Sequence, residues 1–123
     1  MDVESTMLPL GTKMPKFQLY GIDEKTYTNE DFSGKAGTLV MFICNHCPFV
    51  KHVNNELVLL SNELLEKNIG VIGINSNDSS QEKYAEDSFD KMREYSSELG
   101  YKFPYVVDED QSAAKSFTAQ CTP

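Results

Sequence analysis

Two cysteines separated by two residues are the part of this chain best suited to chemistry. Cys44 and Cys47 enclose Asn45 and His46, and Pro48 follows at once. In such a pair one thiolate attacks a disulfide sulfur and the second then displaces the bound sulfur, so the pair is oxidised while the substrate is reduced. The residue types and their spacing therefore favour thiol–disulfide exchange.

The flanking sequence predicts how this pair is positioned. An apolar run at 38–43, TLVMFI, reads as a buried strand, and the apolar residues after Pro48 recur at helical spacing. A strand would thus deliver both cysteines to the N-terminus of a helix. The unpaired N–H groups and the macrodipole there lower a thiol pKa, and a protonated His46 would favour the thiolate further. Strand, CxxC and helix together are typical of a redox motif.

The predicted helix has an apolar side and a polar side. The residues that we predict to lie in the core around it are Phe42, Phe49, Val53, Leu57, Leu60 and Leu64. His52 is expected to be a surface residue of this helix rather than a catalyst.

Other elements follow from shorter patterns. Residues 17–20 and 26–28 predict a hairpin, and Asn29 begins one helical turn that runs to Phe32. The run at 71–75 predicts a second buried strand, parallel to the first. Asn75 and Asn77 lie at its carboxyl end, the edge where sites occur in open α/β sheets. They either neighbour the cysteines or belong to an exposed polar loop.

The last third of the chain predicts a helix at 88–99 preceded by a looser turn, a short strand at 103–107 and a short helix at 111–117. The acidic clusters 86–90 and 108–110 are expected to be solvated surface. No repeat or linker interrupts the chain.

Composition limits the classes of function. The chain has 123 residues, 40% of them hydrophobic, and a net charge of −8, which disfavours nucleic-acid binding. No apolar run reaches the roughly 18–20 residues of a membrane span, and the N-terminus has no signal-peptide pattern. Three cysteines without an export signal predict a reducing, cytoplasmic location. No cofactor or metal is implied.

The residues around the cysteines resemble a known family. Cys44 to Cys47 after a hydrophobic strand looks like the active site of the thioredoxin fold. The string CNHCPFVKHV and the segment 7–35 are similar to bacterial thioredoxin-like proteins of the redoxin branch, within the alkyl hydroperoxide reductase and thiol-specific antioxidant superfamily. The resemblance runs from about Met7 to Pro123, and includes INSND at 74–78 and CTP at 121–123.

This resemblance implies a fold and a division of roles. It implies one α/β, thioredoxin-like domain over 1–123, with central parallel strands, flanking helices and an N-terminal hairpin. Cys44, the more exposed cysteine, would attack, and Cys47 would resolve the mixed disulfide. Pro123 would be a cis-proline facing the pair, with Thr122 offering backbone hydrogen bonds to substrate. The substrate would be a protein or small-molecule disulfide, and a thiol reductant would regenerate the pair.

The residues inside the pair set its expected redox poise. A histidine before the second cysteine also occurs in more oxidising relatives, so His46 and Asn45 predict a couple less reducing than thioredoxin's roughly −270 mV. The family's Trp before the first cysteine is replaced by Ile43, and Thr38 stands where its buried acid would be. No general base for Cys47 is therefore identified.

The family pattern continues beyond Pro123 with an antiparallel hairpin and a final helix. The expected fold therefore lacks these elements, as a truncated chain would, and the strand at 38–43 keeps an exposed apolar edge. A second copy of the chain is expected to cover this edge, giving a dimer.

Three alternatives stay open. Peroxiredoxins carry Thr three residues before the attacking Cys and Pro just after it, so Cys47 could be peroxidatic and Cys44 resolving. Metal binding would use Cys44, Cys47, His46 or Cys121, a set that is incomplete for structural zinc. The pair could also be incidental to a structural domain. Cys121 is either an additional redox thiol or a small, partly buried side chain.

Overall fold

A computed structural model describes residues 8–45 and 47–120. The strands are β1 (Gln18–Gly21), β2 (Thr26–Thr28), β3 (Gly37–Phe42), β4 (Ile69–Asn75) and β5 (Tyr105–Val107). The α-helices are α1 (Pro48–Glu66), α2 (Phe89–Leu99) and α3 (Ser112–Ser116), and the 3₁₀ helices are η1 (Asn29–Phe32) and η2 (Glu82–Asp87). Each predicted strand and helix is present, with ends that differ by a few residues.

The five strands form one mixed sheet in the order β2-β1-β5-β4-β3. β3, β4 and β5 are parallel, while β1 runs antiparallel to both β2 and β5. This arrangement confirms the predicted central parallel strands and N-terminal hairpin. In the described part of the chain, β3 is the last strand on its side of the sheet.

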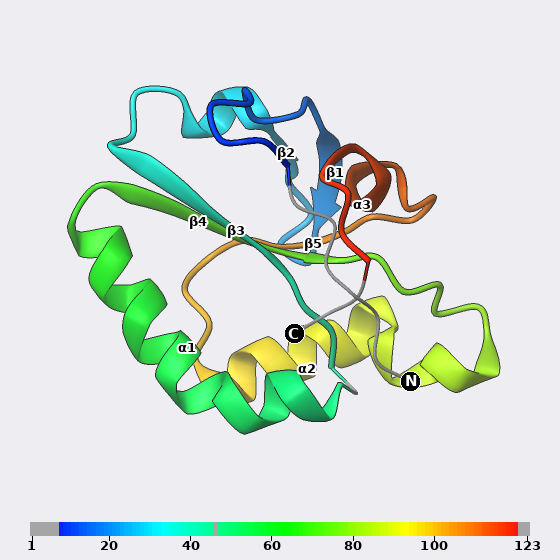
Figure 1. Cartoon of the computed structure of the whole chain (residues 1–123). Coiled ribbons are helices and arrows are strands. Elements are labelled where there is room, and N and C mark those ends of the chain that lie inside the picture. Colours follow the sequence, from blue (N-terminus) through cyan, green and yellow to red (C-terminus); the bar gives the residue numbers. More distant parts are fainter. Residues whose placement is uncertain (1–7, 46, 121–123) are drawn as a thin grey trace.

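Helices cover the sheet on both faces, with α1 and α2 on one face and α3 on the other (Figure 1). β4 lies between them, and its side chains alternate. Val71 packs with Val50 of α1 and Met92 of α2, whereas Ile72 and Ile74 pack with Ala113 of α3. A strand buried on both faces needs the nearly continuous apolar run that β4 has.

Glycine at position 73 is required by close packing on the α1 face of β4. A Cβ atom there would lie 2.8 Å from Phe103 and 3.0 Å from Ile43. Gly73 therefore lets Ile43, the residue before Cys44, pack directly onto the strand.

The core prediction for α1 is partly wrong. Phe49 is 65% exposed and Leu60 is 50% exposed, and Val53 is also largely outside the core. The buried positions are instead Val50, Asn54 and Ser61, with Leu57 and Leu64 partly buried. Both series have helical spacing. The buried one includes polar Asn54, which donates to the Tyr95 hydroxyl, and polar Ser61, which donates to the Val58 carbonyl of the same helix, so both polar side chains are satisfied.

Helix α2 begins and ends as its sequence predicts. The Ser88 side chain accepts a hydrogen bond from the Lys91 N–H, and Gly100 follows the helix in the left-handed region at φ 75°. The looser turn expected before this helix is η2, which carries Asp87 to the cysteine loop.

No helix in the described residues is both long enough and apolar enough to cross a membrane.

Candidate functional site

The cysteine pair lies between the end of β3 and the start of α1. Ile43 extends the pairing with β4 through its N–H to the Ile74 carbonyl (3.0 Å), and Cys44 follows. Cys47 is the N-cap residue of α1 and Pro48 is its first residue. Proline suits this position because its missing N–H would have no partner inside the helix. The predicted order of strand, cysteine pair and helix is confirmed.

The environments of the two cysteines differ from the prediction. Cys44 is 1% exposed and Cys47 is 8% exposed, so the expectation that Cys44 is the more exposed is wrong. Both residues also precede the helix rather than occupying its first turn, because Pro48 begins it. Cys44 follows buried Ile43 directly and joins the same core cluster, which also contains Tyr105.

The helix N-terminus acts mainly on Cys47. The Cys47 carbonyl accepts the first helical hydrogen bond, from the Lys51 N–H at 3.1 Å. The partial positive charge of a helix N-terminus favours an ionised thiol at the N-cap. The first turn of α1 contains no acidic residue that would oppose this effect.

A buried carboxylate holds the loop between the cysteines. Asp87, at the end of η2, is 3% exposed. Its Oδ1 accepts hydrogen bonds from the Asn45 main-chain N–H (2.6 Å) and from Asn75 Nδ2 (3.1 Å), and its Oδ2 accepts one from Asn77 Nδ2 (3.1 Å). Asp87 thus joins the cysteine loop to the carboxyl end of β4.

Sequence reasoning missed Asp87, because it placed the whole cluster 86–90 on the surface. Asp87 sits among exposed acidic neighbours, and no local pattern distinguishes it. It also supplies a buried carboxylate near the pair, which Thr38 cannot, since Thr38 lies near the start of β3 opposite Gly70. The sequence left open whether Asn75 and Asn77 neighbour the cysteines or belong to an exposed polar loop. In the structure both donate to Asp87, which also holds the cysteine loop, and Asn75 is 1% exposed.

The Asn45 side chain is also used to fix the loop. Asn45 is buried, its Oδ1 accepts a hydrogen bond from the Tyr105 hydroxyl (3.0 Å), and its Nδ2 donates one to the Glu86 carbonyl (2.8 Å). With both ends of the carboxamide held by protein groups, Asn45 positions the loop.

Three tyrosines lie close to Cys44. Tyr101 and Tyr95 are bridged by Asn54, which accepts from Tyr101 (2.8 Å) and donates to Tyr95 (2.6 Å). Burial raises the pKa of Tyr101 and Tyr105, and the negative charge of an ionised Cys44 adds to the rise of each pKa. These phenols therefore stay protonated beside the cysteine.

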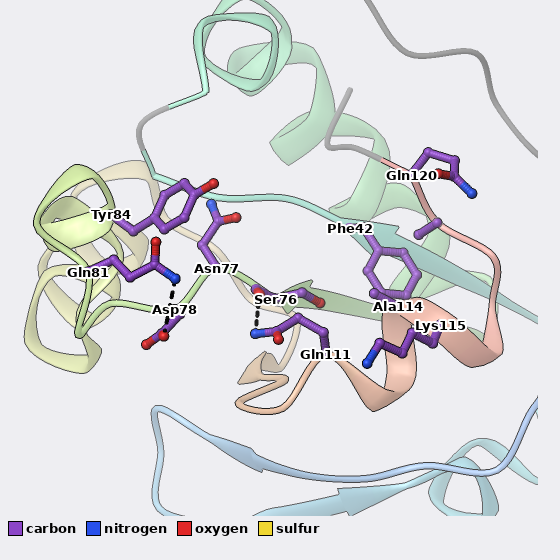
Figure 2. Close-up of a pocket in the computed structure, with 11 residues that line it drawn as sticks. Phe42, Ser76, Asn77, Asp78, Gln81, Tyr84, Gln111, Ala114, Lys115 and Gln120 are labelled. Atoms are coloured by element: carbon purple, nitrogen blue, oxygen red, sulfur yellow. Dashed lines mark hydrogen bonds between the residues drawn. The ribbon is translucent and has the colours of Figure 1, made fainter.

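A pocket of about 410 Å³ opens beside the site at the carboxyl ends of β3 and β4. Figure 2 shows Tyr84 and Asn77 on one side of it and Phe42, Lys115 and Gln120 on the other. Asn77 belongs to both the pocket and the hydrogen-bond network of Asp87. The Asp87 carboxylate links the Asn77 amide to the Asn45 N–H between the cysteines.

Several predicted residues lie outside the described part of the chain: His46, Cys121, Thr122 and Pro123. Their expected roles stay predictions, including the cis-proline. His52 is exposed on α1, as predicted. Within residues 8–45 and 47–120, no group of three or more His, Cys, Asp or Glu side chains is placed to hold a metal ion.

Comparison with known proteins places this geometry in a family. The sequence profile of the AhpC/TSA family matches residues 10–123. An uncharacterised conserved protein from Geobacillus kaustophilus is 49% identical, with a TM-score of 0.93 over 98% of this chain and 64% of that one. Hypothetical protein SMc02350 from Sinorhizobium meliloti is 33% identical, with a TM-score of 0.91 over 97% of this chain and 64% of that one.

A putative thioredoxin from Neisseria meningitidis is 25% identical, with a TM-score of 0.72 over 89% of this chain and 67% of that one. No protein with a curated description matches the chain. The chain spans 64% of the length of each of the two structures with the higher identities. The strand–CxxC–helix arrangement, the mixed sheet and the matched profile agree, and the chain belongs to the AhpC/TSA family with a thioredoxin fold.

Proposed function

We propose that this protein is a thiol–disulfide oxidoreductase that works through Cys44 and Cys47. The observation that carries the proposal is the placement of both cysteines in the short loop between β3 and the N-cap of α1. The helix N-terminus favours the thiolate of Cys47, its N-cap residue, and a thiolate is the species that attacks disulfides. Hydrogen bonds of Asn45 and Asp87 hold the loop that carries both cysteines.

The reaction balances as follows. One thiolate attacks a substrate disulfide, a new S–S bond forms, and one substrate sulfur leaves as a thiolate that takes a proton. The second cysteine then attacks the mixed disulfide and releases the other substrate sulfur. The protein ends with a Cys44–Cys47 disulfide and the substrate with two thiols. A thiol reductant reverses the change in the protein.

The resemblance assigns the first attack to Cys44, whose sulfur is almost fully buried here. The attack therefore requires the loop to move outward. The hydrogen bond from the Asn45 N–H to Asp87 is the contact between the two cysteines that this movement must break.

The test is the alkylation rate of each cysteine as a function of pH, read out by peptide mass spectrometry. We expect one cysteine of the pair to react with an apparent pKa well below the roughly 8.5 of an ordinary thiol. Reduced protein should also convert a stoichiometric amount of a disulfide substrate, and Cys44→Ser and Cys47→Ser should abolish complete turnover. Ordinary reactivity at both cysteines would contradict the proposal.

Peroxidase activity is a second candidate, favoured by one specific observation. Cys47 is the cysteine at the helix N-cap, it is the more exposed of the pair, and Pro48 follows it. In this reaction the Cys47 thiolate attacks one peroxide oxygen, the O–O bond breaks, and the other oxygen takes a proton and leaves as an alcohol or water. Cys47 becomes a sulfenic acid, and the Cys44 thiol condenses with it to a disulfide and water. The only arginine of the chain, Arg93, donates to the Ile22 carbonyl (2.9 Å) and lies over the Phe89 ring.

Peroxide consumption separates the two reactions. Reduced protein that removes one equivalent of hydrogen peroxide in seconds, with Cys47 as the fast-alkylating residue, would favour the peroxidase. Rapid reaction with disulfides and slow reaction with peroxide would favour exchange.

A further inference from the structure

Two of the three phenols that lie close to Cys44 already use their hydroxyl hydrogens within the protein. The Tyr105 hydroxyl donates to Asn45 Oδ1 (3.0 Å), and the Tyr101 hydroxyl donates to Asn54 Oδ1 (2.8 Å). A phenol has one hydrogen to donate. Neither of these two phenols therefore donates to a sulfur atom without first breaking a hydrogen bond that is present in the structure.

The third phenol, Tyr95, uses its oxygen instead. Asn54 Nδ2 donates to the Tyr95 hydroxyl oxygen at 2.6 Å, and among residues 8–45 and 47–120 no acceptor takes the hydroxyl hydrogen. Asn54 is only 5% exposed, and Tyr101 fixes the other end of its carboxamide. This buried amide therefore holds the Tyr95 oxygen in place and leaves the hydrogen for another acceptor.

A small pocket lies where Tyr95 meets the cysteine loop. Its volume is about 150 Å³, and its lining includes Tyr95 of α2, Asn45 between the cysteines and Lys51 of α1. Ligand-binding clefts start at roughly 300 Å³, so this pocket has room for a moving side chain rather than for a whole substrate. Cys44 is 1% exposed and must move outward before it attacks. Because Asn45 follows Cys44 in the chain, movement of the loop into this pocket brings the Cys44 sulfur toward the Tyr95 hydroxyl.

A hydrogen-bond donor at this place would offset two effects that disfavour a Cys44 thiolate. Burial raises the pKa of a thiol, and the buried Asp87 carboxylate, which accepts from the Asn45 N–H, acts in the same direction. Burial also raises the pKa of Tyr95, and the negative charge of an ionised Cys44 adds to that rise. The Tyr95 phenol therefore keeps its hydrogen at neutral pH and remains a donor.

The other charged groups of this pocket are exposed and of mixed sign. They are two lysines and three glutamates, from α1, η2 and α2: Lys51, Lys91, Glu86, Glu94 and Glu98. Exposed charges are screened by salt, with a Debye length of about 8 Å at physiological ionic strength. A direct hydrogen bond to the sulfur is much less sensitive to salt, so the two influences on Cys44 can be separated.

We infer that Tyr95 donates a hydrogen bond to the Cys44 thiolate when the cysteine loop moves outward, and that Asn54 is the positioning residue that directs this hydroxyl. The inference rests on the proposed exchange reaction, in which Cys44 attacks first, and adds a residue to it. Tyr95 keeps its proton throughout, so the balance of the exchange reaction is unchanged. The hydrogen bond increases the share of Cys44 that is present as thiolate, the form that attacks.

The first experiment measures the alkylation rate of Cys44 against pH in Cys47→Ser protein, where the titration of Cys44 is not coupled to that of Cys47. Tyr95→Phe removes the donor and keeps the ring, and we expect the apparent pKa of Cys44 to rise by about one unit. Tyr101→Phe is the matched comparison, because Asn54 already uses that hydrogen, and its effect should be less than about a third as large. The difference between the variants should persist in about 1 M salt.

The second experiment leaves Tyr95 in place. In Cys47→Ser protein labelled with ¹³C at the ζ carbon of tyrosine, the NMR signal of Tyr95 should shift with the same apparent pKa as Cys44, and further than the signal of Tyr101. A Tyr95 signal that does not respond to Cys44, an unaltered Cys44 pKa in Tyr95→Phe, or equal effects of the two tyrosine variants would overturn the inference.

Turnover of a disulfide by the native protein tests the exchange reaction separately. If the pKa of Cys44 rises in Tyr95→Phe but the native protein reduces no disulfide, the exchange reaction fails and the hydrogen bond from Tyr95 stands. If the native protein reduces the disulfide and Tyr95→Phe leaves the pKa of Cys44 unaltered, the role of Tyr95 is overturned and the exchange reaction stands.

Discussion

Asp87 is the residue on which the geometry of the cysteine loop most depends. Asp87 accepts hydrogen bonds from N–H groups of Asn45, Asn75 and Asn77, and the Asn45 donor is the main chain between the cysteines. A carboxylate accepts at both oxygens, whereas an amide accepts at one only. Asn at this position would therefore break part of the hydrogen-bond network, although its side chain has nearly the same shape as that of Asp.

Asp87→Asn should change the redox chemistry as well as the stability. Removing a buried negative charge beside the thiols favours the thiolates, so the apparent pKa of the faster cysteine should fall by about one unit. The dithiol form should gain stability relative to the disulfide, making the couple more oxidising. The free energy of unfolding should drop by about 1–3 kcal/mol as donors lose their partner.

The measurements are alkylation against pH and equilibration with a glutathione buffer, with Asp90→Asn as the control. Asp90 lies three residues away and its side chain is almost fully exposed. A loss of stability in Asp87→Asn with an unchanged alkylation profile and unchanged equilibrium would assign Asp87 a structural role only.

The burial of Tyr105 makes the free energy of unfolding depend on pH in the alkaline range. Burial raises its pKa above the ordinary value of 10.0, so folding favours the protonated phenol. The contribution of the buried Tyr105 phenol to the free energy of unfolding is fully present below about pH 10. It is lost as the pH rises above that value, by up to about 1.4 kcal/mol per pH unit.

We expect the free energy of unfolding in urea to fall more steeply between about pH 10 and pH 11 for the wild type than for Tyr105→Phe. At pH 8 the variant should be about 1 kcal/mol less stable, because Asn45 Oδ1 loses its hydrogen bond. Parallel curves for the two proteins would contradict the burial of this hydroxyl.

At the scale of the elements, α1 has two apolar faces with different roles. Val50 is fully buried against β4 and α2, whereas Leu60, about a quarter turn around the helix, is 50% exposed. Val50→Ala should lower the free energy of unfolding by roughly 2 kcal/mol through lost contacts and a cavity. Leu60→Ala should change it by less than about 1 kcal/mol. Equal losses in the two variants would show that the helix is rotated from this orientation.

Asp108 holds the start of α3, much as Asp87 holds the cysteine loop. The Asp108 carboxylate, fully buried, accepts from the N–H groups of Ala113 (3.0 Å) and Ala114 (2.9 Å) and from the Ser76 hydroxyl (2.7 Å). It caps a helix too short to be stable alone and ties it to the end of β4. The expectation that the cluster 108–110 is solvated surface is therefore wrong for its first member.

At the scale of the whole molecule, exposed apolar surface predicts self-association. α1 exposes Phe49, Val53, Leu59 and Leu60, and no described strand covers the outer side of β3. Patches and strand edges of this kind promote association. We expect sedimentation velocity to show association at high protein concentration, and Leu60→Lys to reduce it.

Leu10→Lys is the matched control, because Leu10 is fully exposed but lies outside α1. Association that responds equally to both substitutions would indicate a general effect of charge. A protein that is monomeric at all concentrations would contradict the predicted dimer.

The sequence by itself determined the elements and their order. Neighbouring residues alone specify these local signals, because the signals depend on backbone hydrogen bonding and on the period of apolar residues. They include the helix cap at Ser88, the end of the helix at Gly100, the run at 71–75 and the strand–CxxC–helix order. The meeting of parallel strand ends at one edge made Asn75 and Asn77 candidates for this site, but it did not exclude an exposed polar loop.

Only the tertiary structure decided which residues are buried and what they contact. Asp87 and Asp108 look like their exposed neighbours in the sequence, and they are buried because donors from distant segments converge on them. The face of α1 that meets the sheet was likewise undetermined by periodicity, since the buried series contains polar Asn54 and Ser61 whereas apolar Phe49, Val53 and Leu60 lie outside the core. The low exposure of Cys44 has the same origin: it depends on tyrosines more than fifty residues further along the chain, which no local pattern could place beside it.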